Sequence, residues 1–190
     1  PVVPCHHIRE YRYLYGAVSP LDGELFTLVM TGTDTAHMNV FLDQLSLAYP
    51  NDYILLLLDN AAWHRSGTLV IPENIELFPL LPYTPELNPI EQIWEEIREK
   101  GFRNEVFDSL RRVVDRLCMV TVNLMDDVER VASITHRSWL IDALKFLSSI
   151  RNLETLVWRI AVAGVKRTSL RAQNWKRPRL KLHGSSMNYT

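Results

Sequence analysis

The feature that most constrains this chain is a short apolar run that ends at an acid. Residues 53–58 are one tyrosine followed by five aliphatic residues, and Asp59 comes directly after them. A short run with no polar position predicts a strand buried on both faces, as in parallel or mixed sheets. A carboxylate at the end of such a strand lies in the crevice where open α/β folds bind their ligands. Asp59 is therefore the first candidate site residue.

A second constraint is a proline-stiffened loop that leads into a helix. Prolines at positions 82, 85 and 89 fall within eight residues, and a helix from Pro89 to about Lys100 is predicted, with Gly101 as its stop. Glu91 lies in the first turn and borders the apolar stripe of this helix. Carboxylate oxygens are the ligands that Mg²⁺ and Mn²⁺ prefer. We expect the chain to bring Asp59 and Glu91 together around a divalent metal.

Each of these two acids also has an explanation that requires no catalysis. Asp59 is a good N-cap for a short helix after the strand. Asn88 suits the N-cap of the next helix, Pro89 its first position and Glu91 its third, which together make a capping box. Glu95, one turn further on, is the substitute ligand if Glu91 is the wrong choice. These alternatives remain open at the level of the sequence.

Other polar residues near the two acids are candidates for substrate contact. Asn60 and Asn88 adjoin them directly, and His64 lies five residues after Asp59. A lone histidine near a helix start is more often structural. The acid-free segment from residue 165 to the end is basic, and it offers possible contacts to a DNA backbone: Lys166, Arg167, Arg171, Lys176 and Arg177.

The remaining pattern predicts an α/β chain with a hairpin first and helices last. Residues 1–147 are expected to form the main domain, and residues 148–190 a helical and basic tail that is partly disordered. One more helix is expected over 153–162, and a flexible tail from residue 166. The expected strands are 10–18, 24–30, 53–58 and 75–78, and the expected helices are 36–48, 62–68, 89–100, 107–121, 126–133 and 138–147.

Composition limits the class of protein. The chain has 190 residues, 47% hydrophobic and 23% charged, which suits one globular domain with or without an appendage. No apolar run is long enough to cross a membrane, and the first residues do not resemble a signal peptide. Two cysteines do not make a disulfide framework, so a reducing, cytoplasmic setting is expected.

Two stretches together resemble the DDE transposases of the mariner superfamily, in their insertion-sequence branch. Residues 57–64, LLDNAAWH, resemble the segment that carries the second aspartate of that family. Residues 81–94, LPYTPELNPIEQIW, resemble the segment of its third carboxylate, and this longer match is the more specific. The resemblance implies a ribonuclease-H-like mixed sheet flanked by helices. It also implies a triad of two Asp and one Glu that holds two Mg²⁺ (or Mn²⁺), with Asp59 as second acid and Glu91 as third.

The chain departs from this family at the first acid. The family places its first Asp on a strand before the hairpin, whereas this chain begins at the hairpin, and neither Asp22 nor Asp34 fits that strand. We therefore expect a sheet that lacks its first strand and a chain that is N-terminally incomplete. The implied partners are double-stranded DNA (transposon ends and target), a separately encoded N-terminal segment and a second copy in a homodimer. If bacterial, the protein would be nucleoid-associated.

Three functions follow from these expectations. The first is the catalytic portion of a DNA transposase, which cleaves and transfers strands with a metal. This portion is incomplete as it stands, so the chain alone is expected to be weak or inactive in cleavage unless a separate N-terminal segment supplies the first Asp. The alternative is a catalytically inactive remnant that binds DNA or a partner segment. A ribonuclease-H-like nuclease unconnected with transposition is weaker, because the 81–94 segment is specific.

Overall fold

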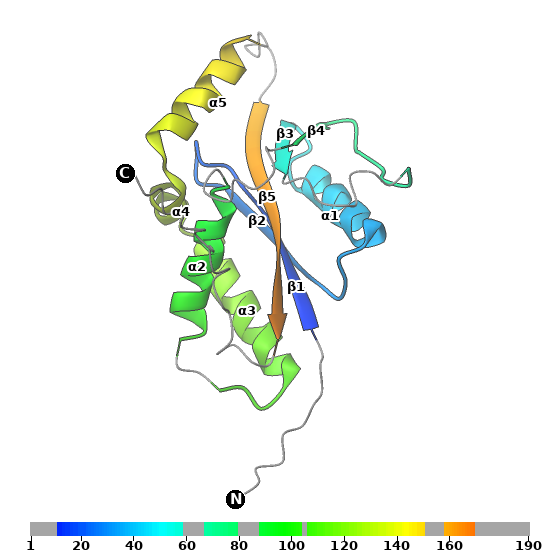
Figure 1. Ribbon diagram of the computed structural model, residues 1–190, viewed down its shortest axis with the longest axis vertical. Coiled ribbons are helices and arrows are strands. Elements are labelled where there is room, and N and C mark those ends of the chain that lie inside the picture. Colours follow the sequence, from blue (N-terminus) through cyan, green and yellow to red (C-terminus); the bar gives the residue numbers. More distant parts are fainter. Residues whose placement is uncertain (1–10, 59–66, 80–87, 104–105, 151–157, 170–190) are drawn as a thin grey trace, which may run out of the picture.

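The computed structural model describes residues 11–58, 67–79, 88–103, 106–150 and 158–169. Its centre is a five-stranded mixed sheet in the order β2-β1-β5-β3-β4 (Figure 1). β1 pairs antiparallel with β2 and with β5, and β3 pairs parallel with β5 and with β4. The strands are β1 Tyr11–Val18, β2 Leu25–Met30, β3 Tyr53–Leu58, β4 Ile75–Pro79 and β5 Trp158–Ser169.

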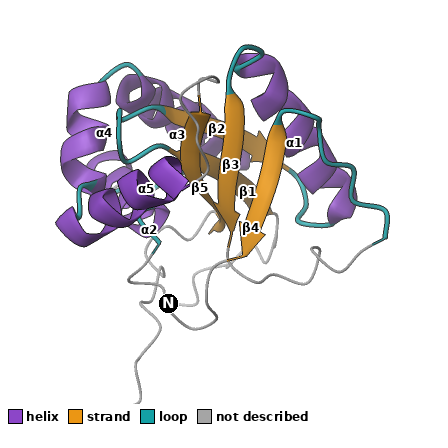
Figure 2. Cartoon of the chain, turned by 90° about the horizontal axis from the view of Figure 1, so that it is seen from above, coloured by secondary structure: helices purple, strands orange, loops and turns teal. Residues whose placement is uncertain are grey.

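Helices cover both faces of this sheet, which confirms the expected mixed α/β class. In Figure 2 the sheet stands between α1 on one side and α2, α3 and α4 on the other. None of the helices in the described ranges is both long enough and apolar enough to cross a membrane. The helices are α1 Thr35–Ala48, α2 Ile90–Gly101, α3 Leu110–Met125, α4 Val128–Thr135 and α5 Ser138–Ile150.

Local chemistry explains where α1 begins and which face it buries. Asp34 is its N-cap, and the Asp34 side chain accepts a hydrogen bond from the backbone N–H of His37 at 3.1 Å. The apolar residues then recur at helical spacing and are buried: Met38, Phe41, Leu42 and Leu45. The expected helix over 36–48 is confirmed to within one residue.

Two hydrophobic clusters form the core, one on each face of the sheet. Strand alternation separates them, because successive side chains of a strand point to opposite faces. On β1, Leu14 and Val18 belong to the cluster under α2, α3 and α4, whereas Tyr15 and Ala17 belong to the cluster under α1. β3 is buried from Ile54 to Leu58, as its unbroken apolar run predicts.

The last strand corrects the expectation for the C-terminal segment. We expected a helix over 153–162 and a flexible tail from residue 166, and both are wrong for residues 158–169, which form β5. β5 inserts between β1 and β3, so its backbone is paired on both sides. Its run 160–165 has no charged residue, which suits a central strand that is paired on both sides.

The other expected helices agree with the structure where it describes them. α4 and α5 match the expected helices at 126–133 and 138–147. α3 begins at Leu110, three residues later than expected, because Ser109 is its N-cap and accepts a hydrogen bond from the N–H of Arg112. The expected short helix over 62–68 lies mostly outside the described residues.

Candidate functional site

Glu91 lies in the first turn of α2, and the residues before it fix where that turn begins. Asn88 is buried, with 6% of its surface exposed, and its Oδ1 accepts a hydrogen bond from the N–H of Ile90 at 3.2 Å. The N–H of Glu91 donates to the backbone carbonyl of Asn88, also at 3.2 Å. The expected cap is therefore wrong by one residue: Pro89 is the N-cap of α2 and has no side-chain cap bond, while the Asn88 side chain bonds Ile90 and not Glu91. The two reciprocal bonds of a capping box are not what the structure shows here.

Two glycines allow the beginning of α2 to approach the sheet closely. Gly16 of β1 lies directly opposite Gly164 of β5. A Cβ added at Gly16 would stand 2.6 Å from Cη2 of Trp94, and one added at Gly164 would stand 2.7 Å from Cγ2 of Ile90. These distances are too short for carbon atoms in contact. The glycine pair is therefore a notch in the sheet into which Ile90 and Trp94 pack.

The carboxylate of Glu91 forms an ion pair with a lysine from the central strand. Lys166 Nζ donates to Glu91 Oε2 at 3.1 Å. The Glu91 side chain is 44% exposed and the Lys166 side chain 33% exposed, so solvent and ions can reach the pair. The structure places Lys166 at the candidate site, and its expected contact with a DNA backbone stays a prediction.

Glu91 is also at the level of the sheet where β3 ends. The pairing of β3 with β5 ends at Leu58 opposite Ala163. Gly164, against which Ile90 packs, is the next residue of β5. The first turn of α2 therefore lies beside the carboxyl end of β3, and the residue that follows Leu58 in the chain is Asp59.

Several predicted site residues lie outside the described residues. These are Asp59, Asn60, His64, Arg171, Lys176 and Arg177. Arg167 lies on β5 opposite Tyr13. The convergence of Asp59 with Glu91 therefore stays a prediction.

The other acids near the site have partners elsewhere. Glu95, one turn after Glu91, is 53% exposed and forms an ion pair with Arg98 at 3.5 Å, and its role as the substitute ligand stays a prediction. Asp22 accepts a hydrogen bond from the N–H of Glu24 in the hairpin turn, which agrees with the expectation that it does not belong to a catalytic strand. Within the described ranges, no three Asp, Glu, His or Cys residues are grouped closely enough to hold a metal ion.

Two ionisable groups near the end of β2 have shifted pKa values, and both shifts have structural causes. Burial raises the pKa of Tyr15 to about 12, with the nearby charge of Asp34 contributing in the same direction. The Tyr15 hydroxyl donates to the carbonyl of Gly32 at 3.1 Å. Hydrogen bonds from His37 hold the pKa of Asp34 below its ordinary value. Asp34 is thus a helix cap and not a candidate metal ligand.

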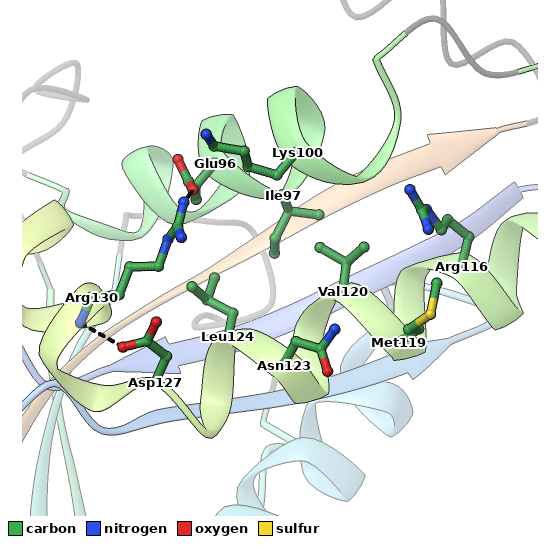
Figure 3. Close-up of a pocket in the computed structure, with 10 residues that line it drawn as sticks. All are labelled: Glu96, Ile97, Lys100, Arg116, Met119, Val120, Asn123, Leu124, Asp127 and Arg130. Atoms are coloured by element: carbon green, nitrogen blue, oxygen red, sulfur yellow. Dashed lines mark hydrogen bonds and ion pairs between the residues drawn. The ribbon is translucent and has the colours of Figure 1, made fainter.

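A cavity of about 430 Å³ lies between α2, α3 and α4, away from Glu91. Figure 3 shows that Ile97, Val120 and Leu124 form the apolar floor of this cavity. Glu96 and Arg130 form an ion pair at one end of it. Glu96 is five positions after Glu91, which turns it about 140° around the helix. The cavity is therefore not part of the Glu91 site.

Sequence reasoning missed the glycine notch and the Lys166 partner of Glu91. Gly16, inside the expected strand 10–18, was a usable signal, because an interior glycine often marks a close approach of another element. Gly164 was not, because no strand was expected there. No local signal pairs residue 166 with residue 91, since that contact depends on β5 entering the sheet.

Comparisons with known proteins show the family of this chain. Residues 2–114 match the family described as DDE superfamily endonuclease. The chain is 33% identical over 130 residues to the uncharacterized protein y4pE/y4sA of Sinorhizobium fredii (strain NBRC 101917 / NGR234), an alignment that covers 68% of this chain and 96% of the relative. No solved structure matches the chain. The matched segment contains both Asp59 and Glu91, and it covers more than half of the sequence: this chain belongs to the DDE superfamily endonuclease family.

Proposed function

We propose that the chain carries the DNA-cleaving site of a transposase, in which Asp59 and Glu91 hold a divalent metal, Mg²⁺ or Mn²⁺. The observation that carries this proposal is the position of Glu91. It stands half-exposed on a helix turn that is packed against the central strand, at the level where β3 ends. Membership of the DDE superfamily endonuclease family supports a nuclease role for these acids.

The alternation along β3 supports the placement of Asp59 near Glu91. Leu56 and Leu58 face α1, so Leu55 and Leu57 face the opposite side of the sheet. If the alternation continues by one residue, Asp59 shares the face of Leu57, which is the face that α2 covers. Parallel strands lie about 4.8 Å apart, so a carboxylate on that face would be close enough to share an ion with Glu91.

The residues present suit a hard divalent cation. Carboxylate oxygens are its preferred ligands, and Mg²⁺ takes few of them because it keeps several waters. Bound metal supplies an activated hydroxyl and stabilises the oxygen that leaves the phosphodiester. Glu91 would contribute a carboxylate held in place by Asn88 and by the packing of Ile90 and Trp94. Basic side chains beyond β5 would neutralise DNA phosphates.

A plasmid-nicking assay tests the proposal. We expect the chain to nick supercoiled DNA weakly and only with Mg²⁺ or Mn²⁺, and we expect Asp59→Asn and Glu91→Gln each to remove this activity. Glu99→Gln is a matched control, because Glu99 is an exposed acid of the same helix that pairs with Arg98. Nicking that persists in the Asp59→Asn, Glu91→Gln double variant would contradict the proposal.

The composition of β5 favours a second candidate, a DNA-binding protein without cleavage activity. β5 lies in the sheet between the hairpin and β3, and residues 158–169 contain no Asp or Glu. Its lysine, Lys166, neutralises Glu91. This candidate predicts that the chain raises the fluorescence anisotropy of a labelled DNA duplex by binding it, with an affinity that falls steeply as the salt concentration rises. It also predicts no metal-dependent nicking. A protein that nicks DNA under these conditions excludes it.

A further inference from the structure

Strand β5 brings a fixed positive charge to the carboxylate that we propose as a metal ligand. Lys166 Nζ lies 3.1 Å from Glu91 Oε2, which is the distance of a charge-assisted hydrogen bond. Residues 2–114 match the endonuclease family, so Glu91 lies inside the matched segment and Lys166 lies well outside it. The ion pair therefore joins the family's matched segment to a part of this chain beyond it.

The backbone on both sides of the ion pair is held in place. Lys166 lies opposite Leu14 in the pairing of β1 with β5, so its Cα belongs to a paired central strand. Glu91 directly follows Ile90, whose side chain packs against Gly164. Gly164 and Lys166 are two residues apart and so share one face of β5. The close packing at Gly164 is what brings Glu91 within reach of the lysine.

The charge of Lys166 opposes the binding of a second cation at the same carboxylate. A metal ion binds a carboxylate oxygen at about 2 Å, so an ammonium on that oxygen would be a near neighbour of the ion. Like charges at this separation repel appreciably even in a partly exposed site, and salt weakens the effect. The metal and the ammonium therefore compete for Glu91.

We infer that Lys166 is a resident counter-cation of Glu91, and that a divalent ion binds there only when the lysine leaves the carboxylate. This inference rests on the proposed function, because it assumes that Glu91 is a metal ligand. It makes Lys166 a positioning residue that controls access to the site. β5 thus supplies the positive charge that neutralises Glu91.

The test measures Mn²⁺ binding by the whole chain, from the free-ion signal in electron paramagnetic resonance. We expect Lys166→Met and Lys166→Gln to bind Mn²⁺ about tenfold more tightly than the unmodified chain at low salt, with a smaller gain at 0.5 M salt. Lys166→Arg keeps the charge and should bind as weakly as the unmodified chain. Two neutralising variants are used so that a folding defect in one does not decide the result.

Lys100→Met is the matched control for net charge. Lys100 is exposed on the same helix as Glu91 but nine residues further along, about 13 Å away by the helical rise. Its removal should leave the Mn²⁺ affinity within about twofold. The gain from Lys166→Met should disappear in the Lys166→Met, Glu91→Gln double variant.

The outcomes separate this inference from the proposed function. If Glu91→Gln weakens Mn²⁺ binding but Lys166→Met leaves it unchanged or weaker, the inference is wrong and the proposed metal site stands. If no variant shows Mn²⁺ binding that depends on Glu91, both are wrong. A gain in Lys166→Met that is matched by Lys100→Met also overturns the inference, because net charge alone would then explain it.

Discussion

Replacing Gly16 by alanine should destabilise the fold, because it fills the notch that admits Trp94. The new Cβ would stand 2.6 Å from Cη2 and 3.3 Å from Cζ2 of Trp94. Carbon atoms in contact are about 3.5–4.0 Å apart, so the ring must move by about 1 Å. Trp94 is 1% exposed, and its neighbour Ile90 is held against Gly164, so little free space is available.

The expected magnitude combines two opposing effects. Overpacking of a well-filled core costs about 1–3 kcal/mol. Alanine in place of glycine restricts the unfolded chain and returns about 0.4–1 kcal/mol. We therefore expect Gly16→Ala to lower the free energy of unfolding by about 1–2 kcal/mol. The measurement is urea denaturation followed by far-UV circular dichroism, with the slope of the transition unchanged.

The control is Gly67→Ala. An added Cβ at Gly67 meets no heavy atom of the described residues within 4 Å, so this change should be neutral or slightly stabilising. A second check is the Trp94→Phe background, which removes the ring atoms nearest to Gly16. The cost of Gly16→Ala should fall there by about 1 kcal/mol, as expected for two residues in contact. Equal effects of the two glycine variants, or the same cost in both backgrounds, would refute the packing argument.

Three further predictions follow from single side chains. Burial raises the pKa of Tyr15 to about 12, so the folded protein keeps this proton to higher pH than the unfolded chain. The contribution of Tyr15 to the free energy of unfolding is therefore complete below pH 10 and falls by up to about 2.5 kcal/mol between pH 10 and 12. Urea denaturation across this range should show a smaller loss of stability in Tyr15→Phe. Asn74→Ala should lower the free energy of unfolding by about 1–3 kcal/mol in the same assay. The Asn74 side chain accepts a hydrogen bond from the Ser46 hydroxyl at 2.6 Å, and it donates to the backbone carbonyls of Tyr49, after α1, and Asp52, before β3. Asn88→Ala should lower the free energy of unfolding by about 1 kcal/mol, because it removes the hydrogen bond from the N–H of Ile90 in the first turn of α2. Mn²⁺ titration should show weaker binding, because the position of Glu91 is then less fixed. Unchanged stability and affinity would contradict the role of Asn88.

The sequence was most informative where one pattern was strong and local. The apolar run before Asp59 predicted β3, and the helical spacing from Met38 to Leu45 predicted α1, because each burial pattern is complete within a few residues. The proline before Ile90 and the stripe through Trp94 predicted α2 in the same way. These elements supply the described half of the candidate site.

β5 was not predicted because its strand character depends on distant partners. Its residues pair with β1, about 150 positions earlier, and with β3, about 100 positions earlier. The local strand pattern is weak because three of its residues are small: Ala161, Ala163 and Gly164. Small residues suit these positions because helices pack closely on both faces of the sheet. The contact of Lys166 with Glu91 depends on the same long-range pairing.

A crystal structure of the whole chain soaked in MnCl₂ tests the central claim most directly, because the anomalous signal locates the metal. We expect Mn²⁺ about 2 Å from a carboxylate oxygen of Glu91 and from one of Asp59, with Lys166 Nζ no longer on Glu91. Mn²⁺ bound away from both acids, or Asp59 and Glu91 side chains that point into separate surroundings, would contradict the account.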